Sequence, residues 1–180
     1  MVQQMIEDVT GKPFAELAQE ILFDKLGMAN STFQQPLPEV FVPQAAIAHR
    51  RTSETVPGKW HIYPMQTAAG LWTTPSDLSR LIIEVFKSYK NQSSVVLSTE
   101  MTQQMLTPQV SWVGLGFPII KVDGKMKFEH PGWNEGYHSL MVGCPETGQG
   151  VVLMTNGENG KHLEREVMRA VPLDYGWEGL

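Results

Sequence analysis

The sequence predicts an α+β fold, in which helices come first and an antiparallel sheet with a C-terminal helix follows. Three observations support this class. Apolar residues repeat at helical spacing in the first half, the spacing changes to every second residue from Val113, and helical spacing returns over Leu163–Val171. A length of 180 residues fits one domain. We divide it into a mainly helical and loop part, 1–108, and a sheet with its terminal helix, 109–180.

Two helices and a long connection are predicted at the N-terminal end. The apolar residues of 1–9 share one helical stripe, which Gly11 ends. Pro13 opens a second helix, which Gly27 ends. Residues 29–70 contain five prolines and show no sustained period, so we expect an irregular connection. A connection this long inside a domain usually lines a site or wraps a neighbouring segment.

The clearest helix starts after residue 73. Thr74 is its predicted N-cap, Pro75 takes the first helical position, and Asp77 completes a capping box. The apolar face of this helix consists of Leu78, Leu81, Ile82, Val85 and Phe86. Ser98 is expected to cap a shorter helix that follows.

Alternating residues predict the sheet. Val113, Leu115, Phe117 and Ile119 indicate a first strand, and Asp123-Gly124 indicates a tight hairpin turn. Met126, Phe128 and His130 then share one face of the returning strand. A second hairpin pairs 137–144 with 151–155. Its apolar runs are nearly continuous, as in strands that are covered on both faces.

Composition narrows the range of partners. A net charge of −5 without a Lys/Arg cluster argues against nucleic acid and anionic membrane as partners. The sequence has no run of eighteen apolar residues, so we expect no membrane span, and its N-terminus has no signal pattern. The first helix starts without an N-cap, which suggests a start placed inside a longer protein.

The stretch from His130 to Ser139 is the strongest candidate for chemistry. His130 stands at the end of a predicted strand. Pro131 cannot donate to a ladder, so the strand should lie at a sheet edge or stop pairing there. Gly132 lets a ligand or another backbone approach closely. The alternative is a partly buried histidine whose ring is satisfied by a backbone carbonyl.

A metal site is disfavoured, and no cofactor is expected. Four possible ligands lie within ten residues: Glu129, His130, Glu135 and His138. Their spacing matches no zinc pattern, and adjacent residues on a strand point to opposite faces. We interpret His49, His61 and His162 as surface or structural residues. Cys144 is interpreted as a packed thiol.

Four segments in order resemble the serine β-lactamase and penicillin-binding-protein-like superfamily, class C type. They cover nearly the whole chain, and they are Val9–Phe14 with Ile21–Thr32, Ala69–Leu78, His130–Gly132 with Gly136–Ser139, and Pro145–Asn156. This family carries a Ser-x-x-Lys motif, a Tyr-x-Asn loop and a Lys/His-x-Gly motif on the edge strand. The third is present here as His130-Pro131-Gly132. No Ser-x-x-Lys occurs, and we interpret Tyr89-Lys90-Asn91 as a solvated helix end.

The resemblance implies roles for individual residues. His130 would assist proton transfer or bind a substrate carboxylate, Gly132 would keep the edge open, and the N–H of Trp133 would be one of two oxyanion donors. Pro131, Asn134 and Tyr137 would bind substrate. Pro131 departs from the more usual hydroxyl residue, which puts recognition of a β-lactam carboxylate in doubt.

Two functions stay open on the sequence. The first is the C-terminal portion of a serine hydrolase that acts on an ester, amide or lactam through an acyl-enzyme and is inactive alone. The second is a non-catalytic peptide-binding or assembly module on the same fold. Ser-x-x-Lys and Tyr-x-Asn motifs encoded before Met1 would favour the first. A half-fold also leaves apolar surface uncovered, so we expect the isolated chain to self-associate.

Overall fold

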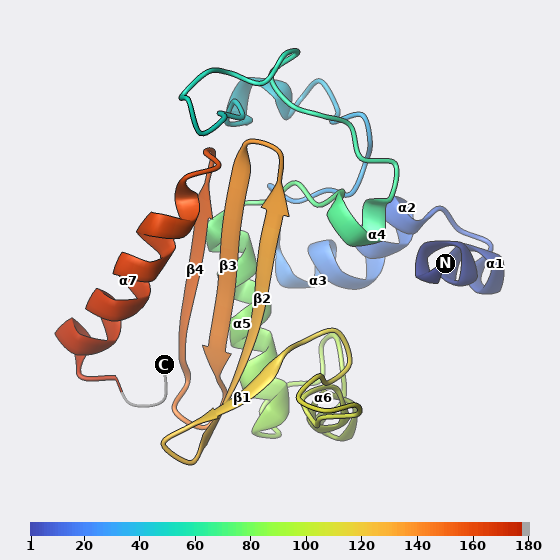
Figure 1. Cartoon of the computed structure of the whole chain (residues 1–180). Coiled ribbons are helices and arrows are strands. Elements are labelled where there is room, and N and C mark those ends of the chain that lie inside the picture. The colour runs from blue at the N-terminus through green and yellow to red at the C-terminus, as the bar shows by residue number, and fades with distance from the viewer. Residues whose placement is uncertain (178–180) are drawn as a thin grey trace.

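A computed structural model describes residues 1–177 and has the expected α+β class (Figure 1). The helices are α1 (Val2–Thr10), α2 (Phe14–Ala18), the π-helical η1 (Gln19–Phe23), α3 (Asp24–Leu26), the 3-10 helix η2 (Val42–Gln44), α4 (Gln66–Ala69), α5 (Pro75–Tyr89), α6 (Thr99–Met105) and α7 (Gly160–Tyr175). The strands are β1 (Ile119–Val122), β2 (Lys125–Asn134), β3 (Tyr137–Cys144) and β4 (Gln149–Thr155). None of the helices in the described range is both long and apolar enough to cross a membrane.

The four strands form one antiparallel sheet in the order β1-β2-β3-β4. Helix α5 packs on one face of the sheet and α7 on the other (Figure 1). The strands of the second hairpin are therefore covered on both faces, as their continuous apolar runs predicted. The chain thus forms three layers, with the sheet in the middle.

Two hydrophobic clusters hold these layers together. The larger one joins α5 to the sheet and includes Ile82, Phe86, Phe128 and Met141. Phe128 is fully buried at its centre. A second cluster, built around Phe23, holds the helices from Phe14 to Leu26 against the start of α5. The core therefore fixes the middle of β2, and the end of β2 extends beyond it.

The start of α5 confirms half of the predicted capping box. The Thr74 hydroxyl accepts a hydrogen bond from the Asp77 N–H at 3.2 Å, as predicted. The Asp77 carboxyl group does not return to Thr74, and that part of the prediction was wrong. It is buried and accepts hydrogen bonds from the Asn30 N–H at 2.8 Å and the Ser31 hydroxyl at 2.9 Å. Asp77 thus ties the long connection to α5, because one carboxylate oxygen accepts from both donors.

The first strand is shorter than the sequence predicted. Strand β1 starts only at Ile119, and residues 113–118 form a bend closed by an isolated bridge between Val113 and Pro118. The Leu115 N–H donates to the Met105 carbonyl, and a side chain at Gly114 would collide with that same oxygen. Docking on α6 therefore overrides the alternating pattern. The predicted turn is confirmed, since Asp123 and Gly124 both have positive φ, of 50° and 78°.

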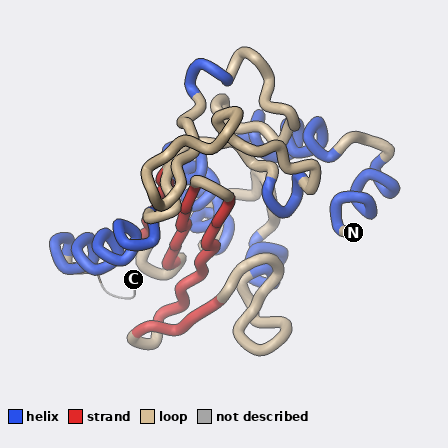
Figure 2. The backbone as a smooth tube through the Cα atoms, turned by 45° about the horizontal axis from the view of Figure 1, so that its top comes forward, coloured by secondary structure: helices blue, strands red, loops and turns tan. Residues whose placement is uncertain are grey.

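The connection from residue 29 to 70 crosses the end of the sheet, above the tip of the β2–β3 hairpin (Figure 2). Most of it is irregular, as expected, apart from η2 and α4. The Gly136 carbonyl accepts a hydrogen bond from the His49 N–H at 3.3 Å. This connection wraps a neighbouring segment, as its length predicted.

Candidate functional site

One edge of the sheet is open beside the predicted site. Strand β2 pairs with β1 only from Lys125 to Phe128, whereas it pairs with β3 through Asn134. Past Glu129, the outer side of β2 has no strand partner in residues 1–177. This confirms the prediction that the strand around Pro131 lies at an edge.

The pairing pattern fixes which backbone groups face this open edge. The Glu129 N–H donates to the Pro118 carbonyl at 3.1 Å, so it points away from β3. Backbone groups alternate in direction along a strand, and those of Pro131 and Trp133 therefore point the same way. Proline has no N–H. The first N–H that faces the open edge beyond Glu129 is consequently that of Trp133.

The His130 side chain is exposed, on the same face of β2 as the buried Phe128. Its one aromatic neighbour is Phe117, whose ring centroid lies 6.2 Å away at an interplanar angle of 81°. Within the described chain the imidazole makes no hydrogen bond. The alternative of a partly buried histidine bonded to a carbonyl therefore does not describe this residue.

Gly132 makes a close contact that the sequence did not reveal. Ser139 lies opposite it on β3. A Cβ atom at position 132 would overlap the Ser139 hydroxyl oxygen. The close approach at this glycine is thus already made by the neighbouring strand. A role of Gly132 toward a ligand at the outer edge stays a prediction.

The side chains of Asn134 and Tyr137 hold the long connection. The Asn134 amide donates to the Ala69 carbonyl at 3.1 Å, and the Tyr137 hydroxyl donates to the Ala46 carbonyl at 2.7 Å. Burial, with a smaller contribution from the nearby Tyr63, raises the pKa of Tyr137 to about 12. Both residues therefore anchor the long connection to the β2–β3 hairpin, and substrate binding by them stays a prediction.

The Trp133 indole lies on the opposite face of the sheet from His130. It stacks on the His138 ring with centroids 5.9 Å apart, and it remains 69% exposed. His138 Nδ1 in turn lies 3.9 Å from a Glu164 carboxylate oxygen on α7. The backbone of Trp133 therefore faces the edge while its side chain rests on the α7 side.

Sequence reasoning missed the role of Glu135, at the turn between β2 and β3. Its carboxylate binds Arg50 at 2.6 Å and His61 at 2.5 Å, and its N–H donates to the Tyr63 hydroxyl at 3.2 Å. His61 is thus a structural residue, as interpreted. These partners lie more than seventy residues away in sequence, and no local pattern links them.

Metal and thiol chemistry gain no support from the geometry. In the described part of the chain, no three His, Cys, Asp or Glu side chains converge. Cys144 is fully buried, as predicted for a packed thiol. Two cavities lie along α5, and the lining of neither includes a residue of β2.

The described residues form a three-layer α+β fold whose sheet edge is open beside His130. Residues 1–172 match the family model described as Beta-lactamase, and the chain belongs to this family. A search of curated proteins gives no match.

Solved structures support the same fold at low identity. The octameric penicillin-binding protein homologue from Pyrococcus abyssi is 21% identical to this chain, with a TM-score of 0.71. The match covers 98% of this chain and 41% of the homologue. A penicillin-binding protein from Bacillus halodurans is 21% identical with a TM-score of 0.76, covering 94% and 53%. A class C β-lactamase variant is 16% identical with a TM-score of 0.69, covering 86% and 50%. This chain spans about half the length of each.

Proposed function

We propose that this chain supplies the sheet-edge side of the active site of a serine hydrolase that forms an acyl-enzyme. Its substrates would be esters, amides or lactams. The observation that carries the proposal is the unpaired edge of β2, with the Trp133 N–H facing outward and an exposed His130 two strand positions before Gly132. Membership in the Beta-lactamase family agrees with it.

Each group has a chemical task in this proposal. The Trp133 N–H stabilises the oxyanion that develops on the substrate carbonyl, together with a second donor from the nucleophile residue. His130 assists proton transfer or binds a substrate carboxylate. The nucleophile and its base come from residues outside these 180, because the sequence contains no Ser-x-x-Lys.

The free energy that one oxyanion donor can contribute is too small for this chain to catalyse alone. One oxyanion donor contributes roughly 3 kcal/mol, whereas an enzyme lowers its barrier by about 8 kcal/mol or more. We therefore expect no turnover of nitrocefin or p-nitrophenyl esters by the isolated chain. A serine-reactive phosphonate should form no covalent adduct with this chain. An adduct on any of its serines, seen by intact mass, would contradict the proposal that the nucleophile comes from other residues.

Pro131 also bears on the non-catalytic alternative. A peptide that docks on the edge of β2 would form a ladder of backbone hydrogen bonds. Pro131 offers no N–H on that side and interrupts the ladder between Glu129 and Trp133. A site that needs one outward N–H tolerates this interruption better than a peptide-binding edge does.

The backbone donor can be tested with a matched pair of variants in the protein that unites this chain with the nucleophile. Trp133→Pro removes both the outward N–H and the indole, whereas Trp133→Ala removes only the indole. We expect kcat to fall about a hundredfold or more in the proline variant relative to the alanine variant. Equal kcat values in two folded variants would contradict the proposed role.

A further inference from the structure

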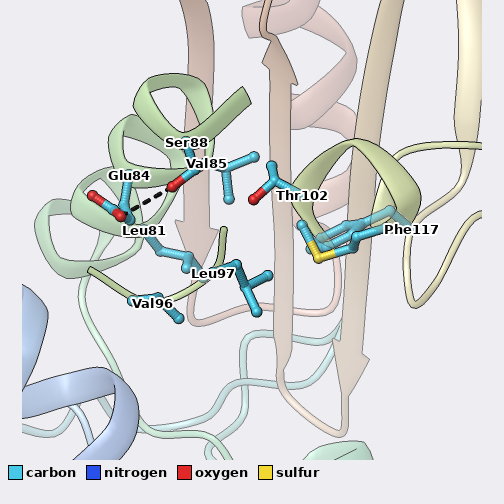
Figure 3. Close-up of a pocket in the computed structure, with 9 residues that line it drawn as sticks. Leu81, Glu84, Val85, Ser88, Val96, Leu97, Thr102 and Phe117 are labelled. Atoms are coloured by element: carbon cyan, nitrogen blue, oxygen red, sulfur yellow. Dashed lines mark hydrogen bonds between the residues drawn. The ribbon is translucent and has the colours of Figure 1, made fainter. Parts of the chain in front are cut away.

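A small cavity lies between α5, α6 and the segment that leads into β1, away from the open edge of β2. Its volume is about 70 Å³. Most side chains that line it are apolar: Leu81, Val85, Val96, Leu97, Met105 and Phe117. The polar lining residues are Glu84, Ser88 and Thr102 (Figure 3).

The Glu84 carboxyl group is already satisfied. It accepts hydrogen bonds from the Ser88 hydroxyl at 3.1 Å, the Ser93 hydroxyl at 2.8 Å and the Val95 N–H at 3.2 Å. Figure 3 shows the first of these as a dashed line. A bound molecule would therefore find little free hydrogen-bonding capacity on Glu84.

Thr102 is different. The residue is 1% exposed, and its hydroxyl oxygen has no hydrogen-bond partner within the described residues. A helical threonine often bonds its hydroxyl to the carbonyl four residues earlier, but here the Ser98 carbonyl accepts from the Thr102 N–H and not from the Thr102 hydroxyl. In Figure 3 the oxygen is directed toward the α5 side chains, across the cavity. A buried hydroxyl without a partner is unfavourable, and a ligand with one matching group would remove that penalty.

The cavity also touches the candidate site through one side chain. Phe117 lines it, packs against the buried Phe128 with centroids 5.2 Å apart, and contacts the His130 ring. A molecule in the cavity that displaces the Phe117 ring changes the surroundings of His130 directly.

We propose that this cavity binds a small neutral molecule with an apolar body and one hydroxyl group, and that its occupancy is transmitted through Phe117 to His130. An engineered apolar cavity of ~150 Å³ binds benzene or xenon, so about half that volume suits a smaller molecule such as a short-chain alcohol. The hydroxyl of such an alcohol pairs with Thr102, and its alkyl chain lies against Leu81, Val85 and Leu97.

Two probes separate the apolar and polar parts of this proposal on the 180-residue chain, without any catalytic readout. Xenon tests the apolar volume, and 1-propanol tests the volume together with the Thr102 hydroxyl. We expect both to shift the methyl NMR signals of Leu81, Val85 and Leu97, and to move the imidazole C–H signals of His130 in parallel. Because no turnover is measured, failure here is distinct from failure of the proposed hydrolase function.

Three variants complete the test. Thr102→Val should weaken 1-propanol binding about fivefold and leave xenon binding intact, whereas Thr99→Val, on the same helix but outside the cavity lining, should change neither. Leu97→Phe should abolish binding of both probes by filling the space. Three outcomes would each overturn the proposal. Neither probe shifts the methyl signals, Thr102→Val leaves the 1-propanol affinity unchanged, or the His130 signals stay fixed when the probe saturates the cavity.

Discussion

The hydroxyl oxygen of Ser139 on β3 occupies the space that a Cβ atom at Gly132 on β2 would fill. The two residues are direct partners in the sheet register. The glycine of the edge-strand motif is therefore matched to a residue seven positions further along the chain. This pairing keeps the two strands close beside the open edge.

This contact predicts a compensating pair of substitutions. Gly132→Ala should lower the free energy of unfolding by about 1–3 kcal/mol, because the new methyl group overpacks against the Ser139 hydroxyl. Ser139→Ala should restore most of that loss in the double variant, since the Ser139 Cβ lies 3.7 Å from the added methyl position. Urea denaturation of the four proteins measures the coupling. Additive effects of the two substitutions would contradict the contact.

Asp77 should matter more for stability than its place at the start of α5 suggests. Asp77→Ala leaves the Asn30 N–H without its acceptor and removes one of the two partners of the Ser31 hydroxyl, and both residues lie in the chain that enters the long connection. We expect the variant to lose about 3 kcal/mol of unfolding free energy. Ser76→Ala, one residue earlier and exposed, is the matched control and should change little. Similar stabilities of the two variants by thermal denaturation would count against this role.

Ionisation of the Tyr137 hydroxyl should lower the stability of the fold at alkaline pH. Burial raises its pKa to about 12, against about 10 in an unfolded chain. The folded state holds the Tyr137 proton more tightly than the unfolded state does. The contribution of protonated Tyr137 to the free energy of unfolding is therefore fully present below pH 10 and is lost as pH rises from about 10 to 12. Tyr137→Phe should flatten the decline over that window.

Tyr137→Phe should also lower the free energy of unfolding at neutral pH. It removes the hydrogen bond to the Ala46 carbonyl, which contributes about 1 kcal/mol. Tyr175→Phe, at a residue that is 70% exposed, should leave the stability unchanged. Melting temperatures measured across pH 8–12 provide the comparison, and parallel curves for wild type and Tyr137→Phe would refute the assignment.

Helix α1 should drive self-association of the isolated chain. Its residues Val2, Met5 and Val9 are 59%, 60% and 81% exposed, and none of its residues is buried. Sedimentation velocity should show a mass that rises with concentration, because this much apolar surface favours association. Met5→Lys should reduce the association, whereas Gln4→Lys adds the same charge on the polar side and should not. A wild-type mass that stays monomeric at every concentration would rule the prediction out.

Local sequence signals predicted those elements whose causes are local. Thr74 caps α5, Asp123-Gly124 forms the turn after β1, and the continuous runs of the second hairpin are covered on both faces. The predicted start of the first strand at Val113 was wrong, because docking of 113–118 on α6 depends on a contact that no periodicity encodes. The second half of the capping box failed for the same reason, since Asp77 found partners more than forty residues away.

In the candidate site, too, features with local causes were predicted and features that depend on distant contacts were not. Pro131 predicted an edge, and the edge is there. The outward direction of the Trp133 N–H follows only from the register, which the Glu129–Pro118 hydrogen bond fixes. The clamp of Glu135 on Arg50 and His61 joins segments brought together by the whole fold, so residue spacing could not predict it.

His130 provides the most direct test of the central claim that the open edge of β2 belongs to an acyl-transfer site. In the protein that unites this chain with its nucleophile, melting temperature and acylation rate are measured on the same preparation of wild type and His130→Ala. We predict an acylation rate about a hundredfold lower with a melting temperature nearly unchanged, because the ring is exposed and contacts only Phe117 among the described aromatic residues. A variant that melts many degrees lower yet acylates at the wild-type rate would show that His130 is a packing residue and would contradict the account.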